Sequence, residues 1–105
     1  MDANIFRNGV TGMELTVTPA ALACFRDEWA FGDGEQVRVF VRYVSGAEEP
    51  FALGITRDTP QEAGLVTAAG PLTFFMESKD LWFLDGGSLQ IDCEGENIVF
   101  RVGPR

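Results

Sequence analysis

Residues 36–44, QVRVFVRYV, alternate between two sets of side chains and decide the fold class of the chain. One set consists of Val37, Val39, Val41 and Tyr43, and the other consists of Arg38, Phe40, Arg42 and Val44. A period of two is typical of a β-strand that buries one of its faces. The stretch therefore predicts a strand of about eight residues, around which the rest of the domain can be arranged.

Further alternating stretches on both sides of this strand predict more strands. They cover residues 14–18, 51–55, 65–69, 72–77, 89–93 and 98–102. Gly70-Pro71 and residues 94–97 supply the turns of two hairpins. The sequence thus predicts a mainly β domain of the α+β class with about seven strands.

One N-terminal helix and one short helical turn are expected between these strands. Thr18 offers a capping hydroxyl and Pro19 suits the first helical position, so the helix should begin there and run to about Phe31. Its apolar stripe consists of Leu22, Cys24, Phe25, Trp29 and Phe31. Ser78 is expected to cap the short helical turn that follows it.

Length and charge limit the possible functions. The chain has 105 residues and a formal net charge of −8, which fits one acidic domain with one core. Its eight basic residues are scattered, so we expect neither nucleic-acid nor membrane binding. No apolar run reaches the roughly 20 residues of a membrane helix and the start resembles no secretory signal, so we expect a cytoplasmic location. Because the periodicity begins at Met13, we place the folded domain at residues 13–105 and a flexible extension at residues 1–12.

The chain contains two cysteines, Cys24 and Cys93, and no histidine. Without histidine it lacks the commonest general base and every Ser–His or Cys–His nucleophile pair, so we do not expect an enzyme. Cys93 is in phase with Leu89 and Ile91, and Cys24 lies in the helix stripe, so both thiols are predicted to be core residues. We predict no catalytic residue, no metal ligand and no cofactor.

Four segments in this order resemble a known family: MELTVTPAALACFRDEW (13–29), QVRVFVRYVSG (36–46), FALGITRDTP (51–60) and SKDLWFLDGGSLQID (78–92). Together they are similar to the HesB/IscA-like iron–sulfur cluster biosynthesis domains, and most similar to the cysteine-poor YneR-like branch. The resemblance extends over about Met13–Val102 and implies a HesB-like β-sandwich or barrel with one N-terminal helix.

The iron-binding carriers of that family hold iron through three cysteines, one in the glycine loop after the long strand and two in a Cys-Gly-Cys tail. Here the first position falls in Ser45-Gly46-Ala47, and residues 100–105, FRVGPR, stand where the tail would begin. Thiolates are the ligands that such clusters need. The resemblance therefore implies a carrier-like fold without the cluster site.

The loop after the long strand, residues 42–50, is the candidate ligand-binding site. The residues proposed for it are Arg42, Tyr43, Ser45 and Glu48. An outward Arg42 could receive a carboxylate or phosphate in a bidentate pair. The alternative is a surface ion pair between Arg42 and Glu48 or Glu49, which would contribute little to stability.

The sequence LWFLDGG offers an aromatic pair, Trp82 and Phe83, outside that loop. Aromatic side chains at such a position are most often packing residues, and we interpret these two in that way. The clusters of carboxylates along the chain are interpreted as a solvated acidic surface.

Three functions remain open from the sequence. The leading hypothesis is a non-catalytic HesB/IscA-like protein, accessory to iron–sulfur metabolism, that binds an unknown protein partner or small ligand. The second is a divergent metal or iron–sulfur protein that uses Cys93 across a homodimer interface. The third is a small-ligand or protein-binding module centred on residues 42–50.

Overall fold

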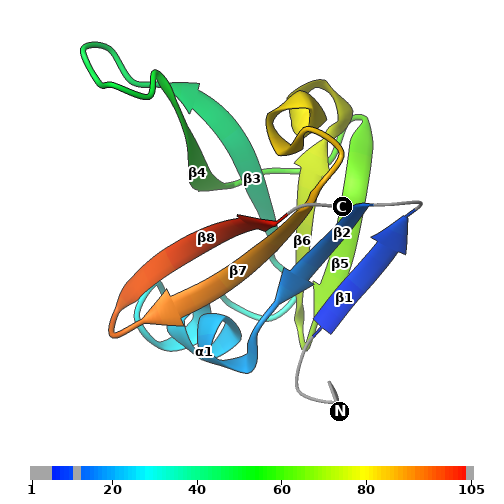
Figure 1. The fold of residues 1–105 in the computed structure, drawn as a ribbon. Coiled ribbons are helices and arrows are strands. Elements are labelled where there is room, and N and C mark those ends of the chain that lie inside the picture. The colour runs from blue at the N-terminus through cyan, green and yellow to red at the C-terminus, as the bar shows by residue number, and fades with distance from the viewer. Residues whose placement is uncertain (1–5, 11–12, 104–105) are drawn as a thin grey trace.

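The computed structural model describes residues 6–10 and 13–103, which form two four-stranded sheets packed against each other (Figure 1). The strands are β1 (Phe6–Val10), β2 (Met13–Val17), β3 (Gln36–Tyr43), β4 (Phe51–Arg57), β5 (Ala63–Ala69), β6 (Leu72–Glu77), β7 (Ser88–Glu94) and β8 (Asn97–Gly103). The helices are α1 (Pro19–Asp27) and the 3₁₀ helix η1 (Ser78–Leu84). The predicted mainly β, α+β fold class is confirmed, with one more strand in the described residues than the sequence indicates.

The strand orders are β1-β2-β7-β8 in one sheet and β4-β3-β6-β5 in the other. The two predicted hairpins, β5–β6 and β7–β8, form as expected, and β3 pairs antiparallel with β4. Two parallel pairs, β2–β7 and β3–β6, join the N-terminal part of the chain to the C-terminal part. The edge strands β1 and β5 lie side by side, whereas β4 and β8 are the edges on the opposite side (Figure 1).

The core lies between the inner faces of the two sheets. Its largest fully buried side chains include Phe25, Phe74, Leu15, Leu65, Leu72, Met76, Leu89 and Ile91. Val37 and Val39 are fully buried, as the alternation of β3 predicts. Thr67 is a buried polar residue, and its Oγ1 donates a hydrogen bond of 2.7 Å to the carbonyl of Leu15 and thereby links the two sheets.

Helix α1 begins as predicted but ends earlier. The Thr18 Oγ1 accepts a hydrogen bond of 3.1 Å from the amide of Ala21 and thus caps the first turn. The helix ends at Asp27, so the predicted extension to Phe31 is wrong. Ala30 takes a left-handed conformation with φ of 59°, and the chain reverses so that Phe31 packs edge-on against Phe25 at 5.4 Å between ring centroids.

Part of the segment predicted to be a flexible extension, residues 1–12, forms a strand. Residues Phe6–Val10 pair antiparallel with β2 over Met13–Val17. An edge strand takes its hydrogen bonds from the backbone of its neighbour, so this segment needs no marked apolar period to pair. Residues 1–5 and 11–12, on which the same prediction falls, lie outside the described residues.

The helical turn η1 follows β6 directly. Its cap position is Glu77 and no side chain caps it, so the prediction that Ser78 is the cap is wrong. The turn ends at Asp85, which is left-handed with φ of 49° and donates its amide to the carbonyl of Trp82 at 3.1 Å. Aspartate tolerates this conformation better than most residues, so η1 stops here and the chain turns into β7.

Candidate binding surface on the β3–β4 hairpin

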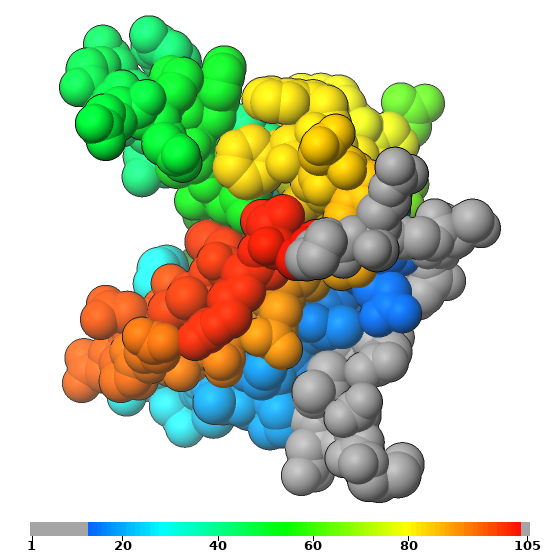
Figure 2. Space-filling view, in the orientation of Figure 1, coloured from blue at the N-terminus to red at the C-terminus, as the bar shows by residue number. Residues whose placement is uncertain are grey.

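The four residues predicted for a binding site lie together at the outer end of the β3–β4 hairpin, which stands away from the body of the molecule (Figure 2). Arg42 and Tyr43 end β3, whereas Ser45 and Glu48 belong to the connecting loop, and all four are exposed. The amide of Val44 donates to the carbonyl of Pro50 at 2.6 Å and closes this loop. The prediction of a site here remains untested, but the structure brings its residues to one exposed tip.

Arg42 forms no ion pair or hydrogen bond among the described residues, so the expected surface pair with Glu48 or Glu49 does not form. Its side chain instead lies against Gly54 on the neighbouring strand. A Cβ atom added to Gly54 would lie 3.3 Å from the Cδ of Arg42 and 2.8 Å from the Cζ of Phe40. The absence of a side chain at Gly54 therefore lets both residues lie across β4.

Three exposed aromatic rings form a continuous row beside this tip, and we call Tyr43, Phe51 and Trp82 the aromatic ridge. Tyr43 is 67% exposed, Phe51 41% and Trp82 57%. The Phe51 ring is edge-on to Tyr43 at 5.9 Å and to Trp82 at 5.2 Å between centroids. The interpretation of Trp82 as a packing residue is thus wrong, because more than half of it faces solvent, whereas its neighbour Phe83 is half-buried and packs against the core.

Sequence reasoning missed Phe51 and Trp82 as site residues. Phe51 could have been found from the hairpin register, because it is the direct partner of Tyr43 and side chains opposite each other share one face. The position of Trp82 could not be predicted in this way, since only the packing of η1 beside β3 brings Trp82 to Phe51.

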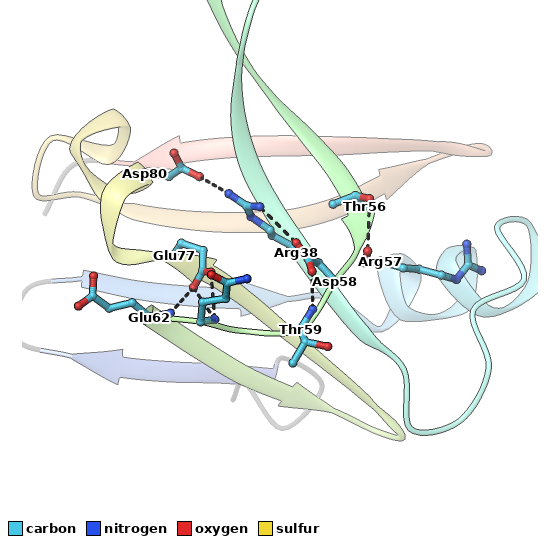
Figure 3. A network of polar contacts seen from close by, with 9 residues as sticks. Arg38, Thr56, Arg57, Asp58, Thr59, Glu62, Glu77 and Asp80 are labelled. Atoms are coloured by element: carbon cyan, nitrogen blue, oxygen red, sulfur yellow. Dashed lines mark hydrogen bonds and ion pairs between the residues drawn. The ribbon is translucent and has the colours of Figure 1, made fainter.

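A polar network anchors η1 and thereby fixes the position of Trp82 (Figure 3). Arg38 on β3 reaches Asp80 of η1 at 3.5 Å and Asp58, which follows β4, at 3.3 Å. The Asp80 side chain is nearly buried, so this pair is shielded from solvent more than a surface ion pair is. Arg38 thus joins the strand that carries Tyr43 to the helix that carries Trp82.

Glu77 is the second buried acid of this region, and Figure 3 shows its carboxylate turned toward the loop before β5. It accepts hydrogen bonds from the amides of Gln61 at 3.1 Å and Glu62 at 3.0 Å. These partners hold the loop in place and use the acceptor capacity of the carboxylate. The geometry indicates a structural role and not a general base.

A hollow of about 420 Å³ lies between the open edges of the two sheets, next to the hairpin. It is lined by Trp29, Phe40, Arg42, Leu53, Gly54, Ile55, Asn97, Ile98 and Phe100. Figure 2 shows the hairpin separated from β8 on this side of the molecule. The lining is mostly apolar with one guanidinium, a composition that is typical of ligand-binding pockets.

The two cysteines lie close to each other, Cys24 on α1 and Cys93 on β7. Cys24 is buried and Cys93 is half-buried, and both line one hollow beside α1. Their thiols donate to the carbonyls of Glu96 at 3.5 Å and Gly95 at 3.1 Å, respectively. Burial, helped by the nearby Cys93 side chain, raises the pKa of Cys24 to about 11, so its thiol stays protonated at neutral pH.

The resemblance to HesB/IscA-like domains raises the question of an iron–sulfur cluster, but the residues present do not fit one. Such a cluster needs several converging thiolates, whereas Ser45-Gly46-Ala47 supplies none and the thiols of the two cysteines donate hydrogen bonds to backbone carbonyls. Within residues 6–10 and 13–103, no three His, Cys, Asp or Glu side chains are grouped so that they could hold a metal ion. No helix in the described part of the chain is long and apolar enough to cross a membrane.

Comparison with known proteins supplies one informative relative. A protein of Bacillus subtilis strain 168 with the name pyruvate dehydrogenase inhibitor is 41% identical to this chain over 81 residues. The matched region covers 75% of this chain and 85% of the relative. No profile of a known protein family matches the chain.

Proposed function

The chain belongs to the family of the Bacillus subtilis protein named pyruvate dehydrogenase inhibitor, and we propose that it is a non-catalytic regulator that binds and inhibits a pyruvate dehydrogenase. The identity of 41% over 85% of the relative is the observation that carries this proposal. A similarity that extends over most of both chains indicates a shared fold, and a shared partner is its simplest functional consequence.

The chemistry of the described residues supports binding in preference to catalysis. The chain contains no histidine, and its buried acids Glu77 and Asp80 are engaged by backbone amides and by Arg38. An inhibitor needs only a surface that covers or distorts its target. The proposal therefore assigns function to the exposed hairpin and not to a catalytic pocket.

The aromatic ridge supports a protein partner. Exposed tyrosine and tryptophan side chains are enriched at protein interfaces, where they supply much of the binding energy. The ridge is fixed in place by the edge-to-face contacts of Phe51 and by the anchoring of η1, so little conformational entropy is lost on binding. We propose that the ridge packs into an apolar depression of the enzyme.

Charge indicates the chemistry of the partner surface around that depression. The exposed Glu48 and Glu49 stand in the loop between Tyr43 and Phe51, and the whole chain has a net charge of −8. Complementary positive charge on the enzyme would raise the association rate, and this effect weakens as salt screens it. Binding should therefore be weaker at high ionic strength.

The resemblance to HesB/IscA-like domains remains a prediction about ancestry and fold. The homodimer and the cytoplasmic location also remain predictions. A role accessory to iron–sulfur metabolism has no support from the donor set, because the described thiols do not converge with other ligands. The inhibitor proposal requires neither iron nor sulfide.

The test is to add the purified chain to the pyruvate dehydrogenase complex of Bacillus subtilis and follow pyruvate-dependent reduction of NAD⁺. We expect a saturable loss of activity that is relieved by added salt. The matched control is a 2-oxoglutarate dehydrogenase complex, whose activity should not change. Full pyruvate dehydrogenase activity in the presence of about 100 μM chain, a concentration that would reveal even weak binding, would show that the proposal is wrong.

A further inference from the structure

We propose that an extended segment of the partner adds to the open edge of β4 and places one carboxylate on Arg42. This inference rests on the proposed function in one respect, namely that the partner is a protein. It assigns a second contact, next to the aromatic ridge, and specifies the sequence pattern of the segment that occupies it.

The hollow lies at the edge of β4 and is lined from both faces of that strand. In the register of β3 with β4, Phe40 is opposite Gly54, and Arg42 is opposite Ala52, so Phe40 and Arg42 are on one face. Leu53 and Ile55 are on the other face of the sheet, the face that meets the core. A hollow that reaches both faces must open onto the strand edge itself.

That edge is available for pairing. Among the described residues β4 pairs only with β3, so one side of its backbone has no strand neighbour. Unpaired edges accept an extended peptide through backbone hydrogen bonds, while alternate side chains enter the pockets on the two faces. On the opposite wall stand Ile98 and Phe100 of β8, the edge strand of the other sheet.

The alternation of an added strand predicts the chemistry of its side chains. Those on the inner face would contact Leu53, Ile55 and Phe100 and should be apolar. Those on the outer face would lie beside Phe40 and Arg42, where a single carboxylate is favoured. The segment should therefore alternate between apolar and polar residues and carry one acidic residue on its polar face.

The lack of an ion pair at Arg42 among the described residues supports a carboxylate on the added segment. Acids outnumber bases in the chain by sixteen to eight, so an arginine readily finds an acidic partner. Ion pairs are formed by Arg26, Arg38, Arg57 and Arg101. Arg42 has none within the described residues and instead borders the hollow. The net charge of −8 would repel a strongly acidic segment, so we limit the prediction to one carboxylate among uncharged neighbours.

The experiment uses Trp29, which lines the hollow, as a fluorescent reporter. Replacing Trp82 by phenylalanine leaves Trp29 as the single tryptophan of the chain. The probes are capped synthetic peptides of about eight residues, a usual strand length, with alternating apolar residues and Glu, Gln or Lys at one central polar position. We expect the Glu peptide to bind at least about tenfold more tightly than the Lys peptide.

The charge-swapped variant Arg42→Glu is the decisive comparison, because it should reverse the order and prefer the Lys peptide. Binding of the Glu peptide should also slow hydrogen exchange of backbone amides in residues 51–56, as strand addition requires. Equal affinity of all three peptides, absence of saturable binding, or unchanged exchange in residues 51–56 would each overturn the inference. Octanoate, an apolar carboxylate, is tested as a small-molecule ligand. Binding of octanoate without binding of the Glu peptide would overturn the inference as well.

The result is distinguishable from a failure of the proposed function. Inhibition of pyruvate dehydrogenase without peptide binding would refute strand addition alone. Peptide binding with the expected charge preference, but without inhibition, would support the site and refute the proposed target.

Discussion

Replacing Trp82 with alanine should remove most of the inhibitory affinity and leave the fold intact. Trp82 is 57% exposed. Because a tryptophan side chain offers up to about 250 Å² of surface, a docked partner could remove about 140 Å² from water. At about 25 cal/mol per Å² the largest possible contribution is about 3.5 kcal/mol. Since a partner seldom covers a residue completely, we expect a loss of about 2 to 3 kcal/mol, or roughly 30- to 150-fold in the inhibition constant.

The assay is a titration of pyruvate dehydrogenase activity with wild type and variant at equal ionic strength. Val66→Ala is the matched control, because Val66 is also an exposed apolar residue, at 37%, but lies on β5 at the opposite edge of the sheet. Its inhibition constant should not change. Circular dichroism and the urea midpoint should confirm that the Trp82→Ala variant is folded, since Trp82 is 57% exposed and its ring contacts are with Phe51 and Phe83.

A folded Trp82→Ala variant that inhibits as strongly as wild type would refute the assignment of the aromatic ridge. So would an equal loss in Trp82→Ala and Val66→Ala, because it would show that the assay responds to general destabilisation. Tyr43→Ala provides an independent check, since Tyr43 is even more exposed and its contact with Phe51 contributes little to the core.

Three further predictions concern the body of the domain. Thr67→Val removes the buried bond to the Leu15 carbonyl and should lower the free energy of unfolding in urea by about 1 to 2 kcal/mol, so an unchanged midpoint would contradict the link between the sheets. The hydrogen bond from Thr18 holds the pKa of Asp92 below its ordinary value of 3.8, so its stabilisation is complete above that pH and lost as the pH falls through the lower folded pKa. Asp92→Asn should therefore flatten the loss of stability between about pH 5 and pH 2 in urea titrations, and an equally steep acid branch would be inconsistent with this role. Since burial raises the pKa of Cys24 from 9.0 to about 11, iodoacetamide at pH 8 should alkylate it about a hundredfold more slowly in the native than in the unfolded chain, and equal rates would disprove its burial.

Local patterns in the sequence were sufficient for most of the strands and for the start of α1. The alternation in residues 36–44 predicts β3, and Thr18 with Pro19 predicts the first turn of the helix, because each signal acts between near neighbours in the chain. The end of α1 was not predicted, because it depends on the reversal at Ala30 that returns Phe31 to the core. The parallel pairing of β3 with β6 likewise depends on packing between distant segments and leaves no local pattern.

The candidate site was predictable in its place but not in its chemistry. Residues 42–50 form an exposed hairpin tip because a loop on a rigid sheet extends into solvent. The sequence did not indicate that Trp82 would join Tyr43 there, because Arg38 and Asp80 connect segments 42 residues apart. It also did not indicate that Arg42 would lack an acidic partner among the described residues, because this depends on the Arg42 side chain lying against Gly54 of the neighbouring strand.

The most direct test of the central claim is a calorimetric titration of the purified chain into the pyruvate dehydrogenase complex of Bacillus subtilis, with catalytic activity measured on the same samples. The account predicts saturable binding whose midpoint concentration coincides with that of the loss of activity. For Trp82→Ala it predicts a much higher midpoint concentration in both measurements. No heat of binding and undiminished activity at saturating chain would contradict it.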